Sequence, residues 1–175
     1  MPSEKLAGLM AAAILSDTVL FKSPTCTARD RRMAERLARI AGIDLEQLGR
    51  EMFSAASGAD KPIEMLINTD FKEFQIAGHA LGVSQVTCLD AESLLSRMDE
   101  FLPAMDKLKA LRGYDMVLMM LTDVLRCGTE LVFLGDEEAI QQAFDTGKIA
   151  GQHVYLPGVV SRKKQIIPAL AALWG

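Results

Sequence analysis

Apolar residues recur at helical spacing through the first third of the chain. Residues 4–15 are apolar on nearly every side and follow Ser3, a residue type that often caps helix N-termini. Two further segments with helical spacing cover residues 28–41 and 45–56. The pattern therefore predicts three helices, the first of which ends before the polar stretch at residues 16–18.

A short run of small residues at positions 56–60 (ASGAD) separates this helical part from a part of different character. It is the one small, flexible stretch between segments that have a clear period, and such stretches commonly mark domain boundaries. The sequence predicts a helical unit over residues 1–56 and a second unit over residues 57–175.

The second part alternates predicted strands with predicted helices. Residues 116–121 form a continuous apolar run of strand length, which is typical of a strand covered on both faces. A long helix is expected after Asp90, with a bend at Pro103. Further strands are expected at residues 71–76, 80–88, 131–134 and 153–156. The predicted fold class is α/β: a mixed sheet of about five strands flanked by helices and preceded by the helical part.

Composition narrows the class of protein without naming a function. The 175 residues carry a formal net charge of −4, which argues against a general nucleic-acid binder. No apolar run reaches the ~18 residues that a membrane-spanning helix needs. The 3 cysteines have no paired spacing and fit reduced thiols. We expect a soluble cytoplasmic protein that binds neither nucleic acid nor membrane.

A basic cluster lies near the end of the chain. Pro168 is acceptable only in the first turn of a helix, so the last helix is expected to begin near residues 165–167. This start places Arg162, Lys163 and Lys164 in the connection that precedes the helix. Three cations beside a helix N-terminus make an anion site. The alternative is a solvated basic loop.

Three segments carry a resemblance to a known family. Residues 14–25 (ILSDTVLFKSPT) resemble the "ISDTLLFKSPT" segment of the manganese-dependent (family II) inorganic pyrophosphatases, which belong to the DHH phosphoesterases. Residues 158–165 are similar to the C-terminal signature "GVVSRKKQ" of that family, and residues 70–74 (DFKEF) resemble its "DAKEF" segment. The order and spacing of the three segments agree with the family over essentially the whole chain.

The resemblance implies a role for four residues. Asp17 matches a carboxylate that binds metal in the family, and Lys72, Arg162 and Lys163 match the basic residues that the C-terminal domain brings to pyrophosphate. It assigns no catalytic residue to this chain. Without the resemblance, Asp17 would be interpreted as an ordinary aspartate at a helix end or in a turn.

The same resemblance implies a partial enzyme. Residues 1–56 correspond to the end of the DHH domain, and residues 57–175 to the complete DHH-associated C-terminal domain. The Asp-His-His motif and most metal ligands of the family are absent from the chain. We therefore expect manganese, or magnesium or cobalt, in the full-length enzyme, and no tightly bound metal in this chain alone.

The predicted function is hydrolysis of pyrophosphate to two phosphates by the full-length enzyme, with this chain supplying a lid that clamps the phosphates. The isolated chain is expected to be inactive and to need a DHH domain in cis or in trans. Two alternatives stay open: an exopolyphosphatase-like phosphoanhydride hydrolase, and a non-catalytic phosphate-binding module.

The apolar residues of segment 4–21 also need cover, because large exposed apolar patches usually mark an interface. We expect this segment either to pack on the next two helices or to mediate self-association. A homodimer is the simplest form of self-association.

Overall fold

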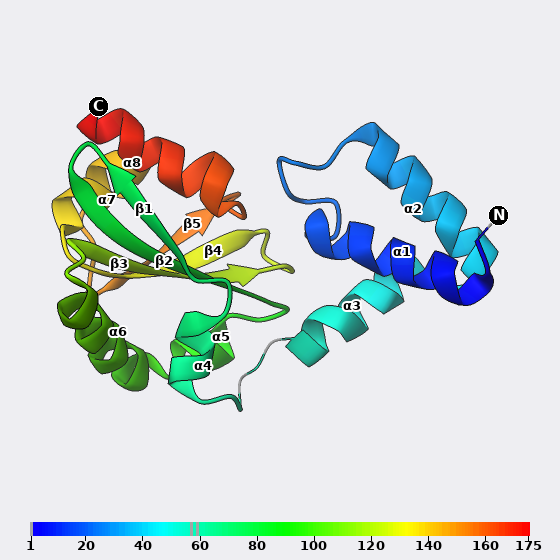
Figure 1. The fold of residues 1–175 in the computed structure, drawn as a ribbon, viewed down its shortest axis with the longest axis horizontal. Helices are drawn as coiled ribbons and strands as arrows, with labels where there is room; N and C mark the ends of the chain where they lie inside the picture. Colours follow the sequence, from blue (N-terminus) through cyan, green and yellow to red (C-terminus); the bar gives the residue numbers. More distant parts are fainter. Residues whose placement is uncertain (1, 57, 59) are drawn as a thin grey trace. The chain divides into compact units, whose positions relative to one another are not determined.

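The computed structural model describes residues 2–56, 58 and 60–175. Contacts along the chain divide it into two compact units, residues 1–56 and residues 57–175, and each is described by itself. Figure 1 shows a purely helical first unit and a second unit built around a sheet. No helix among the described residues has the length and apolar character needed to span a bilayer.

The first unit consists of α1 (Glu4–Asp17), α2 (Ala28–Ala41) and α3 (Leu45–Ala56). The Ser3 side chain caps α1. The three predicted helices are confirmed, but the expected end of the first one is wrong, because α1 continues to Asp17. The hydroxyl of Thr18 donates a 2.7 Å hydrogen bond to the Ile14 carbonyl and satisfies an acceptor of the last turn.

A strained turn follows α1. Val19, Leu20 and Phe21 adopt positive φ angles of 48°, 51° and 64°, a region that residues with a side chain rarely occupy. Leu20 packs so closely onto Gly49 of α3 that a Cβ atom at Gly49 would overlap the Leu20 side chain. Arg31 of α2 donates a 2.8 Å hydrogen bond to the Phe21 carbonyl. Contacts with two helices therefore hold the turn in its left-handed conformation.

The second unit contains one mixed five-stranded sheet in the order β1-β2-β3-β4-β5. Only β2 and β3 run parallel; the other neighbouring pairs are antiparallel. The strands are β1 (Lys72–Ile76), β2 (His79–Cys88), β3 (Met116–Asp123), β4 (Gly128–Leu134) and β5 (His153–Pro157). All residues of the central strand β3 are buried. The predicted α/β fold with a mixed sheet of about five strands flanked by helices is confirmed.

Helices cover both faces of this sheet (Figure 1). One face packs against α4 (Ile63–Asn68), α5 (Glu92–Leu95) and α6 (Met98–Arg112), in a core that includes Phe101 and Met119. The other face packs against α7 (Glu137–Phe144) and α8 (Ile167–Trp174), in a core that includes Leu118 and Phe133. Neighbouring residues of β3 alternate between the two cores, as the pleat of a strand requires.

The helix expected after Asp90 is two helices. α5 ends at Leu95, α6 begins at Met98, and Pro103 lies inside α6. The bend at Pro103 stays a prediction. Arg97, between the two helices, donates to the carbonyl of Lys61 at 2.8 Å. This long-range contact lies at the break between the two helices.

The expected start of the last helix, near residues 165–167, is confirmed, because α8 begins at Ile167. A π-helical turn, η1 (Arg162–Ile166), precedes α8, so Arg162, Lys163 and Lys164 lie in the first helical turn and not in the connection before it. Pro168 has no N–H, and its ring clashes with the carbonyl four residues earlier in a regular α-helix. The wider π-helical turn allows the helix to begin before the proline.

Candidate functional site

Residues 158–165, which we call the basic loop, are fastened to two strands of the sheet. The hydroxyl of Thr129 on β4 donates to the Val159 carbonyl at 2.6 Å. The amide of Gln85 on β2 donates to the Val160 carbonyl at 3.2 Å and to the hydroxyl of Thr122 on β3 at 3.0 Å. The buried Thr129 and the partly buried Gln85 thus set the position of the loop on the sheet.

Gln165 closes the basic loop from its other end. Its Oε1 atom accepts hydrogen bonds from the backbone N–H groups of Val160 (2.9 Å) and Ser161 (3.0 Å). Its Nε2 atom donates to the Gly158 carbonyl at 2.8 Å. One side chain therefore satisfies three backbone groups of an irregular segment and holds the loop in one shape.

Arg162 is the buried cation of the basic loop, with 4% of its surface exposed. Its Nη2 atom lies 2.9 Å from the Oδ2 atom of Asp70. Its Nη1 atom donates to the carbonyls of Asp70 and Val83. The Nε atom has no hydrogen-bond partner among the described residues. A buried charge needs a partner, and Asp70 supplies it.

Lys72, at the start of β1, reaches the same carboxylate. Its Nζ atom lies 3.4 Å from the Oδ1 atom of Asp70, and its side chain is 45% exposed. Arg162 and Asp70 are 92 positions apart in the chain. The fold thus brings two of the three cations singled out in the sequence, Lys72 and Arg162, to one aspartate.

Lys163 follows Arg162 on η1 and is exposed. Within the part of the chain that the structure describes, its side chain makes no hydrogen bond or ion pair. The structure therefore places Lys163 beside Arg162 in sequence but joins it neither to Lys72 nor to Asp70.

Asp17 is exposed at the last position of α1, in the other unit. The described residues contain no group of three His, Cys, Asp or Glu side chains close enough to hold a metal ion. A single exposed carboxylate offers too few donors for manganese or magnesium, which take several oxygen or imidazole ligands. The residues of this chain do not fit a metal centre by themselves.

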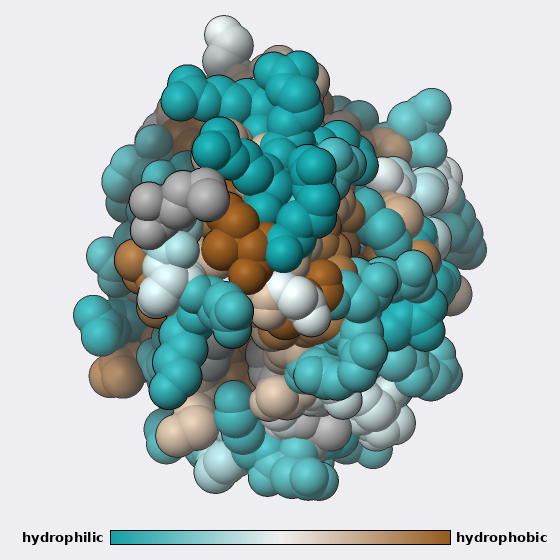
Figure 2. Space-filling model, turned by 90° about the vertical axis from the view of Figure 1, so that its right-hand side faces the viewer, coloured by the Kyte–Doolittle hydropathy of each residue, from teal (hydrophilic) through white to brown (hydrophobic). Residues whose placement is uncertain are grey.

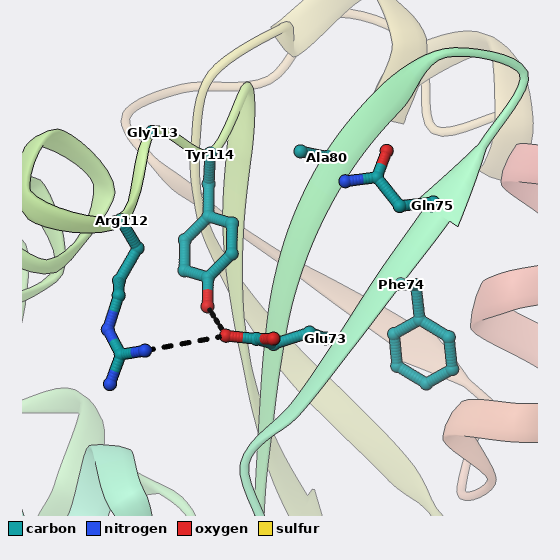
Figure 3. A pocket seen from close by; sticks show the side chains of 7 residues that line it. All are labelled: Glu73, Phe74, Gln75, Ala80, Arg112, Gly113 and Tyr114. Carbon is teal, nitrogen blue, oxygen red and sulfur yellow. Dashed lines mark hydrogen bonds and ion pairs between the residues drawn. The ribbon is translucent and has the colours of Figure 1, made fainter.

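A second polar region lies on the sheet face opposite Arg162. A cavity of about 330 Å³ there is lined in part by Glu73, Arg112 and Tyr114. Figure 3 shows the Tyr114 hydroxyl and the Arg112 guanidinium both directed at the Glu73 carboxylate. Burial and the Glu73 carboxylate raise the pKa of Tyr114 to about 12, so the phenol stays neutral and donates. These groups satisfy one another, and nothing in the cavity points to a ligand.

The sequence analysis missed two residues that shape the site. Asp70 opens the DFKEF segment and Gln165 closes the basic loop, so both stand inside the quoted motifs. Neither an aspartate at position 70 nor a glutamine at position 165 indicates a particular function by its residue type alone. Their positions in the motifs were the only available signal.

Comparisons with known proteins agree with this architecture. Residues 50–173 match the model of the DHHA2 domain. The chain is 42% identical over 168 residues to the manganese-dependent inorganic pyrophosphatase of Methanocaldococcus jannaschii, covering 94% of this chain and 54% of that protein. It is 41% identical over 174 residues to the cobalt-dependent inorganic pyrophosphatase of Clostridium perfringens, covering 98% of this chain and 32% of that protein.

A solved structure is similar as well. A crystal structure described as a family II inorganic pyrophosphatase of Methanococcus jannaschii superposes with a TM-score of 0.87 at 39% identity, covering 99% of this chain and 57% of the other. The chain thus spans about half the length of the first relative and of this structure. The predicted resemblance to family II inorganic pyrophosphatases is confirmed, and the chain belongs to the DHHA2 domain family.

Proposed function

We propose that this chain is the phosphate-binding C-terminal part of a metal-dependent inorganic pyrophosphatase. The observation that carries the proposal is the convergence of Lys72 and Arg162, far apart in sequence, on one aspartate beneath the basic loop. Inorganic pyrophosphatase activity is what the relatives' names describe.

The chemistry of the cations suits pyrophosphate. Arg162 offers a planar guanidinium with several donors, and Lys72 and Lys163 offer compact, mobile charges. Hydrolysis of pyrophosphate leaves negative charge on the departing phosphate, and fixed cations stabilise that charge as it develops. In the proposal these three residues bind and orient the phosphates.

The metal and the remaining site belong to the part of the relatives that this chain does not span. The relatives are named for manganese and cobalt. We propose Asp17 as one ligand of manganese, or of magnesium or cobalt, in an enzyme completed by a DHH domain in cis or in trans. No catalytic residue is assigned to this chain.

Titration of the 175-residue chain with pyrophosphate tests the proposal. Lys72→Ala and Lys163→Ala should each weaken binding about tenfold, because each removes one charged contact with the anion. Lys107→Ala on α6 is the matched control, since this exposed lysine belongs to the helix that covers the opposite face of the sheet. Equal affinity of all four proteins would contradict the proposal. Competition by long-chain polyphosphate would indicate the exopolyphosphatase-like alternative.

An activity assay tests the second half of the proposal. The chain alone, with manganese and pyrophosphate, should show no turnover, because a two-metal site needs several ligands besides Asp17. Adding a separately expressed DHH domain should produce turnover. Robust hydrolysis by the isolated chain would overturn this part of the proposal.

We propose further that the chain forms a homodimer. Three side chains on α1 are exposed although they are large and apolar: Leu6 (49%), Leu9 (68%) and Met10 (42%). Figure 2 looks onto the helical unit and shows brown apolar patches among hydrophilic side chains. Light scattering over a dilution series should show a dimer that Leu9→Glu dissociates. A monomer at every concentration would contradict the homodimer.

We propose a cytoplasmic location because of the state of the cysteines. Cys26, Cys88 and Cys127 are all free thiols, and free thiols persist in reducing compartments. Fractionation of cells that express the natural protein would test the location.

A further inference from the structure

Asp70 has an unusual position in the loop before β1. Its φ angle is +43°, in the left-handed region, where aspartate is one of the few residues tolerated. In this conformation both its backbone carbonyl and its carboxylate Oδ2 atom face Arg162, while Oδ1 faces Lys72. A single residue thus contacts two cations through three oxygen atoms.

The two cations are held unequally. Arg162 is almost fully buried and makes hydrogen bonds to both Asp70 and the Val83 carbonyl. Lys72 is nearly half exposed, and its 3.4 Å approach to Oδ1 is its one ion pair within the described residues. Exposed pairs of this kind contribute little stability, whereas removing a partner from a buried cation such as Arg162 is costly, even though the Asp70 side chain is 48% exposed. Lys72 can therefore leave Asp70 easily, and Arg162 cannot.

The pairing with Asp70 also leaves Arg162 with unused hydrogen-bonding capacity. Its Nε atom is buried and has no acceptor among the described residues. Buried donors are nearly always paired, so an unpartnered N–H on a guanidinium marks a place for a further acceptor. A phosphate oxygen is an acceptor of the right kind.

We propose that Asp70 is the positioning residue of the phosphate-binding site. Through its carbonyl and Oδ2 it keeps Arg162 fixed, and through Oδ1 it holds Lys72 only until an anion arrives. Pyrophosphate and Asp70 then compete for Lys72, while Arg162 stays in place. This inference rests on the proposed function, since it requires that Lys72 binds the phosphate anion.

The substitution Asp70→Asn separates the two roles of the side chain. Asparagine retains an oxygen that can accept from Arg162 Nη2, and the backbone carbonyl is unchanged, but the negative charge that competes with the anion is gone. Metal-free pyrophosphate should therefore bind about two- to fivefold more tightly to Asp70→Asn than to the wild-type chain. The gain should disappear in the double variant Asp70→Asn/Lys72→Ala, because the competition is for Lys72.

A control removes the same charge elsewhere. Asp106 is exposed on α6, against the opposite face of the sheet, so Asp106→Asn changes the net charge equally without touching the site. It should leave the affinity for pyrophosphate unchanged. A gain of the same size in Asp106→Asn would show a general charge effect and overturn the inference.

The remaining outcomes are distinct. A purely structural role for Asp70 predicts weaker or unchanged binding of pyrophosphate to Asp70→Asn, and either result overturns the inference. The proposed function still stands in that case if the wild-type chain binds pyrophosphate. Tighter binding that persists without Lys72 also overturns it. If neither the wild-type chain nor Asp70→Asn binds pyrophosphate, the proposed function fails and the role of Asp70 fails with it. Thermal unfolding of each variant ensures that the titrations use folded protein.

Discussion

The helical unit and the sheet unit bury their side chains to very different extents. In the sheet unit, two clusters of large apolar side chains fill the space on both faces of the sheet. In the helical unit, the buried members of the one cluster are Ala7, Ala11 and Leu37, and two of these are alanines. Because the hydrophobic contribution to stability scales with buried apolar area, the sheet unit carries most of the stability of the chain.

The two units also differ in backbone strain, and the helical unit has the longer strained segment. The helical unit has three consecutive non-glycine residues with positive φ, from Val19 to Phe21. Such residues are isolated in the sheet unit, as at Asp70, Ala77 and Cys127. Each strained residue costs on the order of 1–3 kcal/mol unless its surroundings compensate. The smaller core therefore coexists with the larger local strain, which contacts with α2 and α3 compensate.

Separating the units gives the largest expected effect. Residues 57–175 expressed alone should unfold cooperatively in urea, because both faces of the sheet keep their cores. Residues 1–56 alone should lack a cooperative transition, since a unit of this size with so small a buried cluster is marginal. Circular dichroism and amide NMR spectra measure both. A cooperatively folded 1–56 fragment would remove the contrast between the units.

The second largest effect on stability is expected from one of a pair of leucine substitutions. Leu118 is fully buried in β3, and Leu9 is 68% exposed on α1. Leu118→Ala should lower the free energy of unfolding by about 2–5 kcal/mol through lost burial and the cavity left behind. Leu9→Ala should change it by less than about 0.5 kcal/mol in dilute protein. Chemical denaturation at low concentration provides the values, and similar losses for both variants would contradict the comparison.

Helix caps should behave alike in the two units. Thr27 caps α2 and Asp136 caps α7, each by accepting a hydrogen bond from a backbone N–H group. Thr27→Ala and Asp136→Ala should each cost about 1 kcal/mol, because a cap is a local interaction. Hydrogen exchange of the amides in the two helices measures the costs separately. A much larger cost in α2 would indicate that the cap also supports the strained turn.

The cap of α2 predicts a pH dependence as well. Hydrogen bonds from the Thr27 hydroxyl and backbone hold the pKa of Asp30 below its usual value. The group is therefore more acidic in the folded than in the unfolded state. Its contribution to stability is present above the unfolded pKa and is lost as the pH falls through the folded pKa. The protection factors of the amides in α2, which correct for the intrinsic exchange rate at each pH, should fall in acid, and this acid sensitivity should shrink in Thr27→Ala.

The reactivity of the cysteines can be compared between buried and partly exposed positions without any substitution. Burial, reinforced by nearby Asp123 and Asp90, raises the pKa of Cys88 to about 12. Cys26 in the helical unit and Cys127 in the sheet unit are both partly exposed. A thiol reagent at pH 8 should label these two in the native protein and Cys88 only after unfolding, because the thiolate is the reactive form. Mass spectrometry identifies the labelled residues, and early labelling of Cys88 would show that the sheet core opens.

The sequence revealed those elements whose pattern reflects burial. The continuous apolar run in β3 identified a strand covered on both faces, and the strand is fully buried. Helix α4 escaped prediction because six residues are too few to show a helical period. The break between α5 and α6 also escaped prediction, and at this break Arg97 contacts the distant Lys61 carbonyl. Tertiary contacts of this kind leave no local pattern.

In the candidate site, too, some residues could be predicted from the sequence and others only from the fold. The basic residues Lys72 and Arg162 stood out by charge and by their motifs, whereas their common partner, Asp70, did not. An aspartate near the start of a strand is ordinary, and only the fold reveals that it faces an arginine 92 positions later. Whether Lys163 and Asp17 share a ligand with these residues stays a prediction.

The fastening of the basic loop has a consequence for the order of folding. Its bonds join residues far apart in the chain: 75 positions separate Gln85 from Val160, and 92 separate Asp70 from Arg162. During synthesis, these contacts can form only after residues 160–162 have left the ribosome, by which time strands β1 to β5 have been made. Contacts of such long range also close slowly, because much chain entropy is lost before they form. Competence to bind an anion should therefore appear as one of the last events in the maturation of the protein, after the sheet itself has assembled.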